Sequence, residues 1–154
     1  MKNPTSRGGI AKTSLNRKFR IRLPVQFRDI DVAGHVNHAT YLQYMETARV
    51  ELLRSVGQID IFHPMMILAS ARCEYYQPIL NERRITVTVW ISRISNRSWD
   101  FDYTIESQKR LYANGRTTQV AYDYAKKSAV QISEALKVKL REYSGKPLKF
   151  KGKN

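Results

Sequence analysis

Hydrophobic and polar residues alternate along the segment that follows the first residues of the chain. Between Lys18 and Phe27, which reads KFRIRLPVQF, an apolar side chain occupies every second position. This period of two is typical of a strand that buries one face. Pro24 has no N–H to donate to a neighbouring strand, so the pattern favours an edge position in a sheet.

The spacing changes to that of a helix farther along. Apolar residues recur three or four positions apart, and Gly57 follows the last of them: Tyr41, Leu42, Met45, Ala48, Leu52, Leu53 and Val56. Such a stripe covers one side of a helix, and glycine is common just beyond a helix C-terminus. The pattern predicts one helix of about 19 residues, roughly 28 Å long.

Four strand-like segments follow, rich in Val, Ile, Thr, Tyr and Trp: 65–76, 83–94, 97–107 and 117–126. Composition and alternation both favour strands. Asn96 and Arg97 mark one hairpin turn, whereas residues 107–110 (SQKR) and Asn114-Gly115 compete for the next, and the unused one would be a bulge. A short helix is predicted within residues 132–143, with Ser133 as its N-cap.

The order of these elements predicts the fold class. One strand precedes the long helix and about four follow it without crossover helices, which indicates antiparallel pairing. We therefore expect an α+β domain with an antiparallel sheet of about five strands wrapped around one long central helix. The chain divides into a flexible basic arm at 1–17, the domain at 18–145 and a basic C-terminal tail at 146–154.

Positive charge is concentrated at the two ends. Residues 1–20 carry six Lys/Arg and no acid, and residues 137–154 carry seven against one Glu. The ends therefore supply 12 of the 14 net positive charges. Contact with nucleic acid or another anionic surface is expected of the tails and not of the nearly balanced region between them.

Export or membrane-spanning signals are not evident. No apolar run approaches the roughly 18 residues of a membrane span, and no apolar segment with a cleavage site follows the N-terminus. The make-up of residues 1–17 resembles a transit peptide as well as a flexible arm. Cys73 is the single cysteine, so we expect a half-buried structural thiol and a cytoplasmic location.

Ionisable residues crowd the junction between the first strand and the long helix, which reads DIDVAGHVNH from Asp29 to His38. A helix N-terminus presents unpaired N–H groups that can hold a developing oxyanion. An aspartate beside it can attack an electrophilic carbon or activate a water molecule. The alternative is structural, because aspartate commonly caps helices and turns.

Residues 29–53, DIDVAGHVNHATYLQYMETARVELL, resemble the acyl-CoA thioesterases of the hot-dog fold, in particular the 4-hydroxybenzoyl-CoA thioesterase-like branch. Residues 71–79 (ARCEYYQPI), 96–105 (NRSWDFDYTI) and 111–124 (LYANGRTTQVAYDY) are similar to later strands of that family. The resemblance implies that 107–110 is the turn and that Asn114-Gly115 is a bulge.

The resemblance also implies hydrolysis of an acyl-CoA thioester to a carboxylic acid and free CoA. Asp31 matches the family's catalytic aspartate, while Asp29 is expected to be structural. The backbone N–H near Asn37 would hold the oxyanion, and His38 would assist Asp31. His35 occupies a variable position and is expected to be partly exposed.

Further residues are expected to bind substrate: Gly34, Tyr41, Arg93 and Arg97. The arginines would meet CoA phosphates, although charges at strand ends are commonly only solvated. Glu46 is a second candidate carboxylate, since another branch of the fold uses a glutamate on the helix, but an ion pair with Arg49 or Arg54 is the alternative. We expect no metal and no cofactor, because no fourth ligand accompanies the aspartate and histidines.

Two other functions compete with acyl-CoA hydrolysis. The first is hydrolysis of acyl groups on an acyl carrier protein, whose acidic surface would meet the basic ends. The second is a non-catalytic acyl-CoA-binding module with tails that contact an anionic partner. Unpaired edge strands predict a homodimer or homotetramer with the active site at the subunit boundary.

Overall fold

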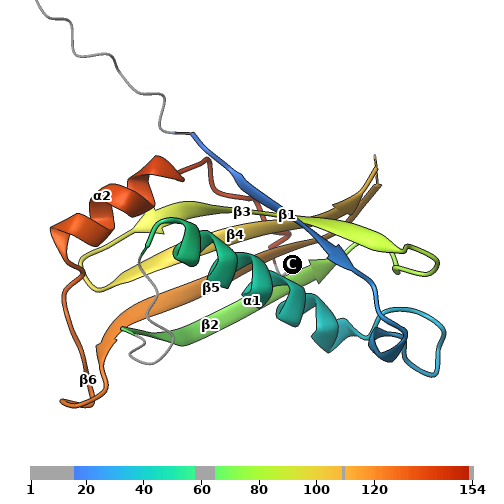
Figure 1. Cartoon of the computed structure of the whole chain (residues 1–154), viewed down its shortest axis with the longest axis horizontal. Helices are drawn as coiled ribbons and strands as arrows, with labels where there is room; N and C mark the ends of the chain where they lie inside the picture. The colour runs from blue at the N-terminus through green and yellow to red at the C-terminus, as the bar shows by residue number, and fades with distance from the viewer. Residues whose placement is uncertain (1–15, 58–64, 109, 153–154) are drawn as a thin grey trace, which may run out of the picture.

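The computed structural model describes residues 16–57, 65–108 and 110–152, so the basic arm predicted at 1–17 lies almost wholly outside the described residues. One helix lies across a strongly curved sheet (Figure 1). The elements in chain order are β1 (Phe19–Pro24), the 3-10 helix η1 (Phe27–Asp29), α1 (His38–Ser55), β2 (Met66–Tyr75), β3 (Arg84–Ile94), β4 (Ser98–Ser107), β5 (Arg110–Asp123), β6 (Ser128–Ala129) and α2 (Glu134–Glu142).

The strands form one sheet in the order β1-β3-β4-β5-β2, and short β6 pairs with β5. Every neighbouring pair is antiparallel. This arrangement confirms the predicted α+β class and the wrapping of a sheet around one helix. Strands β1 and β2, which flank α1 in the sequence, are the two opposite edges of the five long strands.

The hairpin between β4 and β5 decides between the two predicted turns. Ser107 pairs with Arg110, which confirms residues 107–110 as the turn. The register then shifts, because Ile105 pairs with Ala113 whereas Glu106 pairs with Leu111. The extra residue of β5 is therefore Tyr112, and the prediction of a bulge at Asn114-Gly115 is wrong.

Helix α1 confirms the predicted apolar stripe, apart from Leu42, which is exposed. The stripe packs against the inner face of the sheet, and the closest approach is at Gly115. A Cβ at that position would lie 2.4 Å from the sulfur of Met45. Gly115 is therefore required for close packing of the helix on the sheet, and it is not part of a turn. Among the described residues, no helix is long and apolar enough to cross a bilayer.

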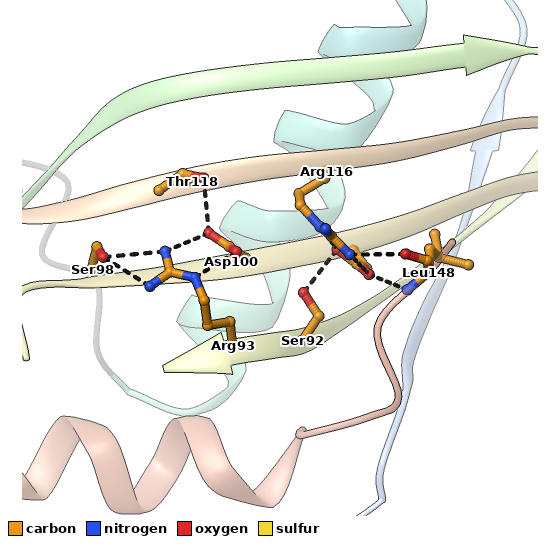
Figure 2. A network of polar contacts seen from close by, with 8 residues as sticks. Ser92, Arg93, Ser98, Asp100, Arg116, Thr118 and Leu148 are labelled. Atoms are coloured by element: carbon orange, nitrogen blue, oxygen red, sulfur yellow. Dashed lines mark hydrogen bonds and ion pairs between the residues drawn. The ribbon is translucent and has the colours of Figure 1, made fainter. Parts of the chain in front are cut away.

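The opposite, outer face of the sheet carries two buried carboxylates of β4 (Figure 2). Asp102 is fully buried and accepts hydrogen bonds from Arg116, Ser92 and the Leu148 N–H. Asp100 pairs with Arg93 through both carboxylate oxygens. Buried carboxylates are tolerated when paired and hydrogen-bonded in this way.

Residues 143–151 run across this outer face. The Gly145 N–H donates to the carbonyl of Ile91 at 2.8 Å, and the Trp90 indole donates to the carbonyl of Lys146 at 3.0 Å. Arg72 of β2 donates to the carbonyl of Lys151 at 2.8 Å. The predicted basic tail at 146–154 is therefore not separate from the sheet, since it crosses β3, β4, β5 and β2 as far as residue 151.

The Asp102–Arg116 pair should contribute strongly to stability. Asp102→Asn leaves the Arg116 guanidinium without its counterion, so we expect the free energy of unfolding to fall by about 3 kcal/mol or more. Urea denaturation at fixed protein concentration measures this loss. The control is Glu51→Gln, which breaks an exposed pair with Arg54 and should cost at most about 1 kcal/mol. Equal losses in the two variants would contradict the expectation.

Candidate active site

The connection between β1 and α1 folds into a small, tight hairpin. Ile30 pairs with Val36 across an antiparallel bridge. The Asp31 N–H donates to the carbonyl of His35, and the Gly34 N–H donates back to the carbonyl of Asp31, both at 3.0 Å. Gly34 has a φ of +80°, which favours glycine at that position of the turn. The turn thereby fixes Asp31 in the connection that leads into α1.

Asp29 anchors this hairpin to the helix. It is buried, and its Oδ2 accepts hydrogen bonds from the Tyr44 hydroxyl at 2.7 Å and the Gln26 N–H at 2.8 Å. Its carbonyl accepts the Asn37 N–H at 2.8 Å. Burial, together with the hydrogen bond to Asp29, raises the pKa of Tyr44 and keeps its hydroxyl protonated as a donor. These contacts favour the structural interpretation of Asp29.

Asp31 has a different environment from Asp29. Its side chain is 24% exposed, its Oδ1 accepts the Ala33 N–H at 2.9 Å, and its Oδ2 lies 3.8 Å from the Nδ1 of His35. Among the described residues, the histidine within 4 Å of Asp31 is His35, whereas the sequence hypothesis paired the aspartate with His38. The turn thus engages one carboxylate oxygen of Asp31, and the other oxygen faces the imidazole ring of His35.

Asn37 caps the helix in a way that changes its predicted role. Its side-chain oxygen accepts the Ala39 N–H at 2.9 Å. Its own N–H already donates to Asp29, so it is not available to a substrate oxygen. Within the described residues the His38 N–H has no acceptor, which makes it the N–H of the first turn best suited to an oxyanion.

A pocket of about 280 Å³ opens at this end of α1. The residues that line it come from the hairpin, the first turn of α1 and the end of β2: His35, Val36, His38, Tyr41, Tyr75, Tyr76, Gln77 and Pro78. The Tyr75 hydroxyl donates to the carbonyl of His38 at 2.9 Å. The rings of Tyr41 and Tyr75 meet edge to face, with their centroids 5.0 Å apart. Strand β2 is thus joined to the start of α1.

The tyrosine wall of the pocket carries no charge at neutral pH. Burial is the main cause of the raised pKa of Tyr75, and a hydrogen bond with Cys73 adds to it. Burial likewise raises the pKa of the Cys73 thiol. Because a thiolate is the reactive form of cysteine, these surroundings favour the predicted structural role of Cys73.

The predicted site residues fall into two groups. His38 and Tyr41 line the pocket, and Gly34 forms the turn beside it. Arg93 and Arg97 lie at the other end of the sheet, because the ten residues from Arg84 to Arg93 in β3 span about 30 Å. Arg93 is also committed to Asp100. Within one subunit, these arginines do not belong to the pocket.

Glu46 lies outside the residues that line the pocket. Its carboxylate is 3.5 Å from Arg49, as the ion-pair alternative predicted. The guanidinium of Arg49 is buried on the sheet side of α1, which the sequence pattern did not indicate. The sequence analysis also did not identify three pocket residues, Tyr75, Tyr76 and Gln77. Their polar groups directly precede Pro78 at the end of a predicted strand, a position where binding residues are common.

Comparison with known proteins places the chain among thioesterases. The model of the thioesterase-like superfamily matches residues 25–140. The long-chain acyl-CoA thioesterase FadM of Escherichia coli is 23% identical over 129 residues, which cover 80% of this chain and 98% of that protein.

Solved structures agree in fold. A predicted thioesterase from Bacillus stearothermophilus superimposes with a TM-score of 0.80 at 23% identity, over 85% of this chain and 99% of that one. A thioesterase from Thermus thermophilus, complexed with coenzyme A and Zn, has a TM-score of 0.73 at 27% identity, over 83% of this chain and 95% of that one.

The two aspartates should differ in their effect on stability. Asp29→Asn weakens the buried contacts with Tyr44 and Gln26, so we expect a loss of about 1 to 3 kcal/mol in the free energy of unfolding. Asp31→Asn affects a partly exposed turn residue and should change it by no more than about 0.5 kcal/mol. Thermal and urea unfolding of both variants measure this contrast. A larger loss for Asp31→Asn would contradict the assignment of Asp29 as the anchor.

Proposed function

We propose that this chain, which belongs to the thioesterase-like superfamily and is a thioester hydrolase of the hot-dog fold, acts on acyl-CoA. The products would be a carboxylic acid and free CoA. The observation that carries the proposal is the position of Asp31 in the tight hairpin that leads into α1, with its Oδ2 3.8 Å from His35, which lines the pocket. The coenzyme A complex of the Thermus thermophilus relative and the substrate of FadM support this choice of substrate.

Asp31 acts as base or nucleophile in this proposal. Its Oδ1 is held by the Ala33 N–H, which leaves Oδ2 for a water molecule or for the thioester carbon itself. As base, Asp31 takes a proton from a water molecule whose oxygen bonds to the thioester carbon, the C–S bond breaks, and the proton passes to the departing sulfur. As nucleophile, Oδ2 itself bonds to the carbon, the thiolate leaves and takes a proton from solvent, and water then hydrolyses the acyl-aspartyl anhydride to the carboxylic acid and free Asp31. The Nδ1 of His35 lies 3.8 Å from Oδ2 and faces this same carboxylate oxygen.

The start of α1 supplies the electrophilic part of the site. The carbonyl oxygen of the thioester gains negative charge as the carbon is attacked, and the His38 N–H with the positive end of the helix dipole stabilises it. This replaces the Asn37 N–H of the sequence hypothesis, because Asn37 already donates to Asp29. Asn37 instead orients the first turn through its contact with Ala39.

The pocket of one subunit is small for an acyl-CoA. Its volume of about 280 Å³ is at the lower limit for ligand pockets. The adjoining edge strand β2 is largely exposed and presents Ile67 and Leu68 to solvent. A second copy that pairs β2 with β2 in antiparallel fashion would cover this edge, extend the sheet and add its own wall to the pocket. We therefore infer at least a homodimer.

Antiparallel pairing of two β2 strands also bears on the predicted phosphate ligands. Such pairing brings the far end of the second sheet toward the pocket of the first. Arg93 and Arg97 lie at that far end, about 30 Å from the start of β3. Their predicted contact with CoA phosphates is therefore possible only across the subunit boundary, and the Asp100 pair favours Arg97 for this role.

Replacement of the proposed catalyst tests the function directly. Asp31→Asn keeps the size of the side chain but removes its charge and proton affinity, so we expect kcat to fall at least about 100-fold, with KM changed only several-fold. Steady-state kinetics on short, long and aromatic acyl-CoAs provide the measurement. Asp123→Asn is the matched control, because Asp123 holds an equivalent turn through the Ala125 and Lys126 N–H groups. Activity of Asp31→Asn within about threefold of wild type would exclude Asp31 as the catalyst.

A charge on the exposed edge tests the assembly. Ile67→Glu should shift the protein toward monomer in sedimentation equilibrium and lower turnover with it, because two negative charges would face each other across the paired edges. Val138→Glu is the control, since Val138 is an exposed apolar residue of α2. A wild-type protein that is monomeric and fully active at micromolar concentration would disprove the dimer.

A further inference from the structure

Two connections meet at the end of the molecule opposite α2 (Figure 1), and both contribute residues to the pocket. One is residues 25–37, between β1 and α1, and the other is residues 76–83, between β2 and β3. The Val36 N–H donates to the carbonyl of Ile79, and the Val25 N–H donates to the carbonyl of Arg83, both at 3.0 Å. We call these two connections, with the start of β3, the tip.

The tip exposes large apolar side chains to an unusual degree. Phe27 is 95% exposed, Val32 is 109% exposed and Leu80 is 51% exposed. Full burial of each such side chain is worth about 1.5 to 3 kcal/mol, and Phe27 and Val32 gain almost none of it within the subunit. Val32 stands in the hairpin turn immediately after Asp31, with exposed Ala33 and Gly34 beside it in the chain. Exposed apolar side chains gathered on neighbouring loops indicate an interaction surface.

Basic residues surround these apolar side chains. Arg28 follows Phe27, Arg83 and Arg84 close the second connection, and all three are exposed. The carboxylates of the same connections are engaged: Asp29 is buried, and Glu82 accepts hydrogen bonds from Ser107 and Tyr112. Asp31 is partly exposed within its turn. The exposed charge of the tip is therefore mainly positive.

We propose that the tip is a membrane-surface anchor that inserts Phe27 and Val32 among lipid chains while Arg28, Arg83 and Arg84 contact anionic headgroups. Exposed apolar side chains surrounded by cationic ones suit an anionic lipid surface, because the apolar groups can enter the acyl-chain region while the cations contact the headgroups. A groove for an acidic protein segment would be concave, whereas Phe27 and Val32 stand almost fully exposed on a short 3-10 helix and a turn. The 25–37 connection of the tip, which carries Phe27 and Val32, follows β1 at the sheet edge opposite the β2 edge proposed for dimer contact, whereas the 76–83 connection follows β2 itself.

An anchored tip would place the pocket mouth at the lipid surface. His35 and Val36 of the same hairpin line the pocket, so an amphipathic acyl-CoA could enter from the membrane without crossing bulk water. This route of substrate entry rests on the proposed function, whereas binding of the tip to a membrane does not. Asp31→Asn should bind vesicles at least as well as wild type, which separates failure of the anchor from failure of the catalyst.

Co-sedimentation of the full chain with vesicles tests the anchor. We expect binding to vesicles of phosphatidylcholine and phosphatidylglycerol, and at least about tenfold weaker binding for Phe27→Asp/Val32→Asp, because burial of two side chains is lost. Arg28→Glu/Arg84→Glu should weaken binding to the same vesicles by about tenfold or more. The matched controls on the opposite end are Val138→Asp and Lys126→Glu/Arg141→Glu, which should bind as wild type does. Because all variants keep both basic tails, equal binding by tip variants and wild type would overturn the proposal.

Fluorescence gives a second, local readout. The two native tryptophans, Trp90 and Trp99, are each 1% exposed, so a tryptophan at position 27 reports on its own surroundings. Phe27→Trp emission should shift to shorter wavelength with anionic vesicles and be quenched by brominated lipids, whereas Val138→Trp should show neither change. If Phe27→Asp/Val32→Asp instead changes the oligomeric state in sedimentation equilibrium, the tip is a protein interface and the anchor is disproved.

Discussion

Close packing of α1 on the sheet is the constraint from which the site follows. Met45 occupies the space that a side chain at residue 115 would need, so the helix can approach β5 only where that strand carries glycine. With α1 in this position, its first turn lies beside the end of β2, where Tyr75 donates to the carbonyl of His38. The pocket therefore forms where the positive end of a helix dipole meets a strand end.

Two aspartates separated by one residue have different tasks because their surroundings differ. Asp29 is buried, and its contacts with Tyr44 and Asn37 tie the hairpin to the helix. Asp31 stands in the turn that this anchor supports, partly exposed and beside His35. A buried structural carboxylate thus supports the turn that holds a more accessible one, which is the arrangement that the proposed catalytic role of Asp31 requires.

The two faces of the sheet are closed in different ways, and this determines where the surface stays open. The inner face is covered by the apolar side of α1. The outer face holds ion pairs among β3, β4 and β5, and backbone groups of residues 143–151 bind to this face. Strand β2 and the tip remain uncovered, and both carry exposed apolar residues. A second copy would cover those of β2, and a lipid surface would cover those of the tip.

The sequence by itself determined the order and type of the main elements and the site of the candidate chemistry, because alternation, helical spacing and turn composition act within a few residues of one another. Only the tertiary structure decided that His35 is nearest to Asp31, that the Asn37 N–H is occupied, and that Tyr75 completes the pocket. It also moved the bulge from Asn114-Gly115 to Tyr112. These features depend on contacts between segments far apart in the chain, or on competition between neighbouring hydrogen-bond partners. Local sequence patterns predict neither.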